Sequence, residues 1–137
     1  MDNEKQLQAE ANQYCKRIIG NLAEDFEKLD NLLNETNEVY NSEIEEIEDR
    51  IQECLSVEVI TKKSSTRGTL EKGIKIVLSL GGPNCHIYYD WEENEAEMFF
   101  SWWSPFVKAQ LNNEEYKTLM RLCEVYYMED LYSFLVE

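Results

Sequence analysis

The sequence predicts one α+β domain, made of an N-terminal helical hairpin, a four-stranded antiparallel sheet and a C-terminal helix. Apolar residues recur at helical intervals in the first part of the chain and alternate with polar residues after Ser56. The links between the expected strands are too short for parallel crossovers, which favours antiparallel neighbours. At 137 residues, the chain fits a single domain. We expect helices within 1–55, a β-meander over 56–103 and a helical part over 112–136.

Two helices are expected in the first 55 residues. A stripe with intervals of three or four residues crosses most of the first 34, and Gly20 with Asn21 either kinks that helix or divides it, because glycine costs roughly 1 kcal/mol relative to alanine in a helix interior. Ser42 and Glu45 form a capping-box pattern for a second helix that runs to about Leu55. The first stripe is Leu7, Ala11, Tyr14, Ile18, Leu22, Phe26, Leu29 and Leu33, and the second is Ile44, Ile47, Ile51 and Leu55.

Four strands are expected after this hairpin. Alternation of apolar and polar residues predicts strands near 57–62 and 74–80, and Gly81-Gly82-Pro83 ends the second of them. Residues 85–91 and 96–103 form the third and fourth strands around an acidic turn. The short connections make these strands a meander.

A final helix is expected after Ser104-Pro105 breaks the fourth strand. Asn112 and Glu115 form a second capping pattern. One face of this helix is apolar, and a last helical turn or two can follow it. The face consists of Tyr116, Leu119, Cys123 and Tyr126, and the later residues are Leu131, Phe134 and Leu135.

The formal net charge is −15, which disfavours direct binding to nucleic acid or anionic lipid. By segment it is −11 over 1–60, +4 over 61–80 and −8 over 81–137. The basic strip consists of Lys62, Lys63, Arg67, Lys72 and Lys75, and the densest acidic run of Glu43, Glu45, Glu46, Glu48, Asp49 and Glu53. Carboxylates at i,i+3 lie roughly 5 to 6 Å apart on a helix, which approaches the phosphate repeat of a nucleic-acid strand. The run is either a nucleic-acid mimic or a solvated face that confers solubility.

A second acidic cluster surrounds the expected turn between the third and fourth strands. It consists of Asp90, Glu92, Glu93, Glu95 and Glu97. The cluster lacks the spacing and glycine of an EF-hand loop, and nothing in the sequence places two of its carboxylates across a pocket for acid-base chemistry. We interpret it as a surface acidic edge.

Large apolar side chains crowd both faces of the expected fourth strand. They are Met98, Phe99, Phe100, Trp102 and Trp103. These residues pack in the core, or the tryptophans anchor a protein partner at an interface whose rim is acidic. Tyr88, Tyr89 and Trp91 on the preceding strand can extend such a patch.

Cysteine and histidine usage predicts no metal site and no cofactor. Cys15, Cys54, Cys85 and Cys123 are far apart, and His86 is the single histidine, so no zinc pattern forms. Cys85 and His86 are adjacent and, on a strand, point to opposite faces, which opposes a nucleophile-base pair. No apolar run approaches the roughly 18 residues of a membrane span, and the start of the chain is acidic and polar. We therefore expect a cytoplasmic protein.

The segment Leu80-Gly81-Gly82-Pro83-Asn84, followed by two strands and Trp102-Trp103, resembles a group of small uncharacterised proteins of bacterial phages, plasmids and integrative elements. Asn21-Leu22 and Phe26-Glu27 are similar to the helical part of that group. The resemblance implies a mobile-element setting, in which small acidic proteins often inhibit host defence, as anti-CRISPR and anti-restriction proteins do.

The sequence therefore favours a non-enzymatic inhibitor that binds a basic host protein, such as a CRISPR effector or a restriction enzyme. One alternative is an antitoxin or immunity protein that neutralises a basic toxin, and another is a small enzyme that uses Cys85, His86 or the acidic turn. A homodimer is also possible. The expected partner-binding residues are Glu43, Glu45, Glu46, Glu48, Asp49, Glu92, Glu93, Glu95, Trp102 and Trp103.

Overall fold

The structure, a computed structural model, describes residues 3–35, 41–63, 70–90 and 92–127, with 61–63 and 70–72 described by their backbone alone. This part of the chain has an α+β fold with one antiparallel sheet in the order β1-β2-β3-β4-β5. The helices are α1 (Asn3–Glu35), α2 (Ser42–Ile51) and α3 (Asn113–Leu122), which continues into a π-helical turn, η1 (Cys123–Tyr127). The strands are β1 (Ser56–Lys63), β2 (Leu70–Ser79), β3 (Asn84–Asp90), β4 (Glu95–Ser101) and β5 (Val107–Lys108).

The predicted fold class is confirmed, and the predicted strand count is wrong. The fifth strand, β5, has only 2 residues and follows Ser104-Pro105, so it has no alternating pattern long enough to recognise. The fourth strand ends at Ser101, which leaves Trp102 and Trp103 in a loop. The expected last turn at Leu131, Phe134 and Leu135 lies outside the described residues.

Helix α1 is one continuous helix of 33 residues. Gly20 does not divide it, and this residue is exposed, with no atom within 4 Å of the position that a Cβ atom would take. The period of the helix was predicted correctly. The predicted apolar stripe extends too far toward the C-terminal end of the helix, because Leu33 is 54% exposed. The buried stripe is Ala11, Cys15, Ile19, Leu22, Phe26 and Leu29.

The N-cap of helix α2 lies one residue earlier than the sequence predicts. The Asn41 side chain is the N-cap and accepts hydrogen bonds from the amides of Glu43 and Ile44 at 2.9 and 3.3 Å. The expected capping role of Ser42 is therefore wrong. The helix also ends well before Leu55, which is 61% exposed.

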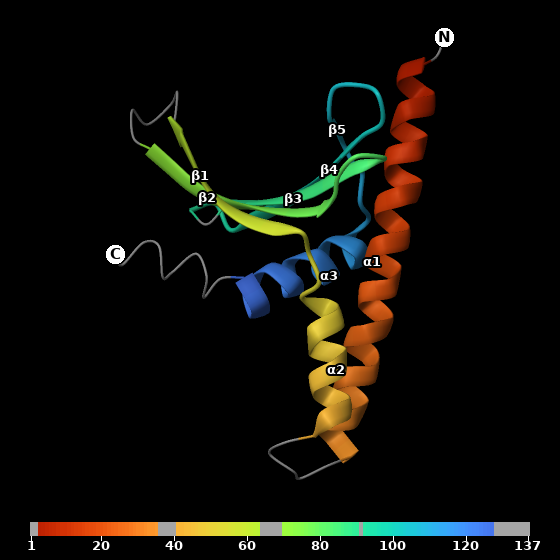
Figure 1. Ribbon diagram of the computed structural model, residues 1–137, viewed down its shortest axis with the longest axis vertical. Coiled ribbons are helices and arrows are strands. Elements are labelled where there is room, and N and C mark those ends of the chain that lie inside the picture. Colours follow the sequence, from red (N-terminus) through yellow and green to blue (C-terminus); the bar gives the residue numbers. More distant parts are fainter. Residues whose placement is uncertain (1–2, 36–40, 64–69, 91, 128–137) are drawn as a thin grey trace.

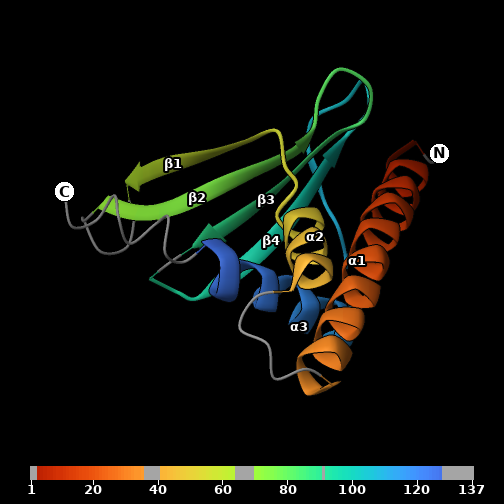
Figure 2. The same cartoon turned by 60° about the horizontal axis from the view of Figure 1, so that its bottom comes forward.

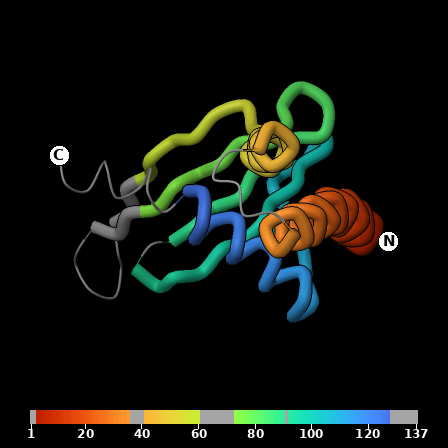
Figure 3. The backbone as a smooth tube through the Cα atoms, turned by 90° about the horizontal axis from the view of Figure 1, so that it is seen from below, coloured from red at the N-terminus to blue at the C-terminus, as the bar shows by residue number. Residues whose placement is uncertain are grey.

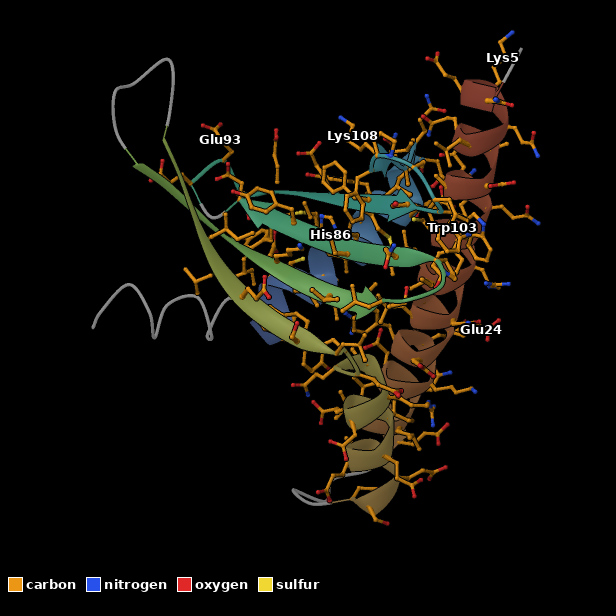
Figure 4. The ribbon with its side chains drawn as sticks, turned by 45° about the horizontal axis from the view of Figure 1, so that its top comes forward. Lys5, Glu24, His86, Glu93, Trp103 and Lys108 are labelled. Atoms are coloured by element: carbon orange, nitrogen blue, oxygen red, sulfur yellow. The ribbon has the colours of Figure 1, made fainter. Side chains whose placement is uncertain are left out.

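The helices lie against one face of a strongly curved sheet (Figures 1 and 2). Strand register places Val77 and Tyr88 on the opposite face and the other buried apolar side chains of β2, β3 and β4 on this face. They are Ile74, Ile76, Cys85, Ile87, Tyr89, Ala96, Met98 and Phe100. The opposite face carries Lys75, His86 and Phe99, and Figure 4 shows His86 on the side turned away from α3.

Helix α1 also runs along the β5 side of the sheet (Figure 2). The Gln8 side chain donates to the carbonyl oxygen of Lys108 at 2.9 Å, and the Gln110 amide donates to Asn12 Oδ1 at 2.8 Å. These bonds satisfy polar backbone groups beside the short edge strand, which otherwise offers them to another chain.

Helix α3 begins with the predicted capping box, in which Asn112 and Glu115 exchange hydrogen bonds of 2.8 Å with each other's backbone amides. Arg121 then fixes α3 to α1. Its guanidinium donates to both carboxylate oxygens of Asp30, at 2.6 and 2.9 Å, and lies 4.2 Å from the ring centroid of Phe26. Figure 3, which looks along α1 from below, shows α3 beside that helix.

Gly73 of β2 provides the space for the ring of Tyr88 on β3. A Cβ atom at this position would lie 2.6 Å from Tyr88 Oη and 2.7 Å from the carbonyl oxygen of Tyr89. We expect Gly73→Ala to lower the free energy of unfolding by about 1 to 3 kcal/mol, because both strands must shift. Urea denaturation measures this change. Gly82→Ala is the control, since no atom lies within 4 Å of its Cβ position, and equal effects of the two substitutions would contradict the prediction.

The ion pair of Asp30 and Arg121 has a defined pH dependence. The hydrogen bond from Arg121 holds the pKa of the Asp30 carboxyl below its ordinary value of 3.8. The pair therefore stabilises the fold above that pH, and its contribution is lost as the pH falls through the lowered value. Because both side chains are partly exposed, we expect Asp30→Asn to cost at most about 1 kcal/mol at neutral pH. The loss should shrink as the pH falls below 3.8, as measured by denaturation curves at several pH values, and a loss that is the same at every pH would contradict the prediction.

Candidate partner-binding surfaces

The acidic row of α2 follows from the burial of its opposite side. Ile47 and Ile51 are 5% and 4% exposed and face the core, so charged positions on the other side of the helix point outward. Glu43, Glu46 and Asp49 are exposed and follow at intervals of three residues, and Glu53 lies just past the end of the helix. We call these four residues the α2 row. Carboxylates at this spacing lie roughly 5 to 6 Å apart along one side of a helix.

Two of the sequence-predicted acids of α2 lie beside this row. Glu45 is exposed, whereas Glu48 is half-buried and accepts a hydrogen bond from the Tyr126 hydroxyl at 3.4 Å. Burial and the nearby Glu48 carboxylate raise the pKa of Tyr126 to about 12, so this hydroxyl stays protonated at neutral pH. Glu48 thus has a contact within the fold, where the sequence suggested only a surface acid.

The second half of α1 adds further acidic groups next to α2. Figure 1 shows the two helices extending together away from the sheet as an antiparallel hairpin. Over residues 24–35 and 42–53, the described basic side chains are Lys28 and Arg50, and Arg50 already donates to Asp25 at 2.8 Å. The acids of the hairpin are Glu24, Asp25, Glu27, Asp30, Glu35, Glu43, Glu45, Glu46, Glu48, Asp49 and Glu53. The end of the hairpin therefore carries a concentrated negative charge.

The acidic turn between β3 and β4 is held by its own hydrogen bonds. The Asp90 carboxylate accepts from the amide of Glu93 at 3.1 Å, and the Tyr89 hydroxyl donates to Asn94, which has a φ of 52°. Glu92, Glu93 and Glu95 are exposed. Asp90 thus stabilises the turn. Among the described residues, no group of three or more His, Cys, Asp or Glu side chains has the arrangement of a metal site.

The loop after β4 presents aromatic side chains to solvent. Trp103 is 90% exposed, and Trp102 and Phe106 are each about half exposed. Trp103 has a φ of 53°, a backbone region that is unusual for a bulky residue. Ser101 and Ser104 fix the loop through a 2.6 Å bond from Ser101 Oγ to the carbonyl oxygen of Ser104. Such strain persists where the surrounding structure enforces it and is frequent at binding sites.

A groove of about 480 Å³ lies beside this aromatic loop, between α1 and the turn that joins β2 to β3. Tyr14, Phe100 and Trp102 supply its aromatic walls, and Arg17 lies 5.3 Å from the ring centroid of Tyr14. Arg17 and Phe106 belong to this surface but were not predicted from the sequence. The only sequence signal for Phe106 was its place directly after the Ser104-Pro105 break.

The structure does not bring the three sequence-predicted groups together. The acidic turn precedes β4 and the aromatic loop follows it, so the two lie at opposite ends of that strand, as Glu93 and Trp103 do in Figure 4. The α2 row lies on the hairpin, below the helix-covered face (Figure 1). One flat partner surface cannot contact all three groups at once.

Cys85 and His86 point to opposite faces of β3. Cys85 is 1% exposed, and its hydrogen bond with Cys15 and its burial raise the pKa of the thiol, which keeps it protonated and weakly nucleophilic. His86 packs between Phe99 and Phe106 at ring distances of 5.1 and 4.7 Å. Burial and the charge of Lys75 lower the pKa of His86. The two side chains do not form a nucleophile-base pair.

No family model, curated protein or solved structure matches the chain. In the described part of the chain, none of the helices combines the length and apolar character that crossing a bilayer requires.

Trp103 tests whether the exposed aromatic loop contributes to folding. We expect Trp103→Asn to change the free energy of unfolding by less than about 1 kcal/mol, because the ring is exposed and asparagine tolerates the observed φ. Phe100→Ala, at a site that is 3% exposed, should cost about 3 to 5 kcal/mol. Chemical denaturation of both variants measures the difference. A large loss of unfolding free energy in Trp103→Asn would mean that the tryptophan side chain stabilises the fold, which would contradict its assignment as an exposed contact for a partner.

Proposed function

We propose that the protein is a non-enzymatic acidic inhibitor that binds a nucleic-acid-handling defence protein of its host. The observation that carries this proposal is the α2 row, which stands on a hairpin that extends from the sheet and has few basic side chains around it. A projecting, regularly spaced series of carboxylates suits insertion into a basic channel. The mobile-element resemblance of the GGPN and Trp-Trp segments supports the class of target.

In this mechanism, carboxylates of the hairpin take the place of backbone phosphates in the partner's channel. Nucleic-acid-binding proteins recognise phosphates mainly through Lys and Arg side chains, and carboxylates accept the same charge-assisted hydrogen bonds. The Glu43, Glu46 and Asp49 side chains are exposed before binding, and the helix fixes their spacing. Charge complementarity of this kind accelerates association and makes binding sensitive to salt.

The aromatic loop and the acidic turn supply further contacts only to a partner that wraps around the molecule. Trp102 and Trp103 suit a hot spot, since exposed tryptophans are enriched among residues that dominate binding energy. Because they lie away from the hairpin, their contribution is separable from that of the carboxylates. If replacement of both tryptophans leaves binding intact, mimicry by the carboxylates is sufficient. If it abolishes binding while a variant of the carboxylates still binds, the protein acts by occlusion.

The decisive variant changes the charge of the α2 row without changing its buried side. It combines Glu43→Gln, Glu46→Lys and Asp49→Lys; glutamine is used at Glu43 because a lysine in the first turn opposes the helix dipole. The tagged protein is first used to capture its partner from host lysate. We expect the variant to bind the purified partner at least about tenfold more weakly at low salt, as measured by calorimetry, and DNA or RNA to compete with the unmodified protein.

The matched control combines Glu4→Gln, Glu58→Lys and Glu124→Lys, which makes the same change in net charge at exposed positions away from the hairpin. We expect it to retain most of the affinity. Equal weakening by both variants, or binding that is indifferent to salt and nucleic acid, would contradict the hairpin mechanism. Capture of a toxin that the protein neutralises, with no defence protein bound, would show the antitoxin alternative to be correct.

A further inference from the structure

Exposed apolar side chains gather at one end of the sheet. Trp102, Trp103 and Phe106 come from the loop after β4, and Leu80, which is 66% exposed, comes from the turn after β2. The register of β3 with β4 brings the loop and the turn side by side, and we call these four residues the aromatic end. At about 150 to 250 Å² for each aromatic side chain, the three rings alone expose roughly 300 to 450 Å². An apolar patch of this size is often a binding surface.

The groove beside the aromatic end is open to solvent. Phe100 forms its buried floor, and its other lining residues are at least partly exposed. Its volume of about 480 Å³ lies in the range that holds whole small molecules, which is ample for one indole ring. Trp103 does not line the groove. One copy of the chain therefore presents a projecting tryptophan and an open groove within the same patch.

The aromatic end is nearly neutral, whereas the hairpin is strongly negative. Over residues 24–35 and 42–53, eleven acids stand against Lys28 and Arg50. Over residues 3–20, 79–87 and 97–112, which surround the aromatic end, the net charge is +1. The bases there are Lys5, Lys16, Arg17 and Lys108, and the acids are Glu4, Glu10 and Glu97. Two copies of so acidic a protein therefore repel each other least when they meet at this end.

We propose that two copies of this chain form a symmetric dimer through their aromatic ends, with Trp103 of each copy in the groove of the other. A two-fold contact uses the same patch on both copies, so a patch that contains both the ring and the groove can be complementary to itself. In the groove the indole meets Tyr14 and Trp102. It also stacks on the exposed guanidinium of Arg17, which already lies 5.3 Å from the ring centroid of Tyr14.

The two-fold axis of this dimer crosses α1, so that the two hairpins point in opposite directions. Leu29, in the middle of the hairpin part of α1, lies about 18 Å from Arg17 along the helix. This distance is more than twice the Debye length of about 8 Å at physiological salt, so the repulsion between the hairpins is largely screened. The α2 row stays accessible in both copies, which makes the dimer independent of the proposed partner binding.

The size of the contact indicates moderate affinity. Burial of the exposed rings and groove walls of two copies removes on the order of 1,000 Å² from water, which is small for a specific interface. The loop that carries Trp103 is already fixed by the 2.6 Å bond from Ser101 to Ser104, so little conformational freedom is lost on association.

Sedimentation velocity of the full-length protein, from about 1 to 200 µM, tests the dimer. We expect monomer at the low end of this range and dimer at the high end. The dissociation constant should fall between about 0.05 and 0.5 M salt, because screening reduces the repulsion between two acidic copies. Binding of the hairpin to a basic partner has the opposite salt dependence. A protein that stays monomeric over the whole range, or a dimer that salt weakens, would overturn the proposal.

Two substitutions locate the contact. Trp103→Asn removes the projecting ring, and Arg17→Glu replaces the cation of the groove by an anion; both residues are exposed, so the fold should tolerate each change. We expect each variant to raise the dissociation constant of the dimer about tenfold or more. Leu33→Gln is the matched control, because it removes an exposed apolar side chain at the hairpin, and it should leave the dimer unchanged. A dimer that neither groove variant weakens, or that Leu33→Gln weakens equally, would contradict the assignment.

A lipid surface is another occupant that exposed tryptophans suit. Flotation of the protein with neutral phosphatidylcholine vesicles distinguishes it from a second copy. We expect the protein not to float with the vesicles. Flotation of a monomeric protein that Trp103→Asn abolishes would identify the aromatic end as a membrane contact and overturn the proposal.

Discussion

The fold depends on burial of one side of α1. Six side chains, from Ala11 to Leu29, form a continuous stripe that contacts the sheet, α2 and α3. An isolated helix gains little from intrinsic propensity, so most of its stability comes from packing such a face. Each large apolar side chain buried contributes roughly 1.5 to 3 kcal/mol. Without α1, the helix-covered face of the sheet, α2 and α3 would each lose their principal neighbour.

The same burial decides where the charge lies. Once one side of α1 and the Ile47 side of α2 are fixed inside, the remaining positions of both helices must face water. Ion pairs within the fold occupy Arg50 and Arg121, each of which holds a carboxylate of α1. Basic groups are thus used to join the helices, and the outer surface of the hairpin keeps its excess of acids. Packing and surface charge are two results of one pattern of residues.

Local patterns in the sequence were sufficient for most elements of the fold. The three- and four-residue intervals of α1, the alternation in β2 to β4 and the Asn112-Glu115 capping box each depend on neighbours in the chain, and they were predicted correctly. The cap of α2 was misassigned because Asn41 and Ser42 both suit an N-cap and only the backbone angles distinguish them. The strand β5 was missed because 2 residues carry no period.

The candidate sites were harder to predict, because they depend on contacts between distant residues. From the sequence, Glu48 was grouped with the neighbouring surface acids. In the structure it accepts a hydrogen bond from Tyr126, far along the chain, and this bond joins α2 to η1. The exposure of Trp103 follows from the end of β4 and from a positive φ, neither of which composition reveals. The groove beside the aromatic loop is lined by residues of α1, of the turn between β2 and β3, of β4 and of the loop after it, so no single segment contains a signal for it.

The bonds that Gln8 and Asn12 make beside β5 give the two edges of the sheet different properties. With α1 along the β5 side, β1 is the edge at which another extended chain can add through backbone hydrogen bonds. Open edges of this kind promote sheet-to-sheet association unless charged residues interrupt them. Glu58 is an exposed charge within β1, and a charge on an edge strand disfavours the addition of an apolar strand. The two edges of the sheet are therefore not equivalent, because polar side chains of α1 bond the backbone beside β5, whereas β1 depends on its own charged residue to discourage pairing.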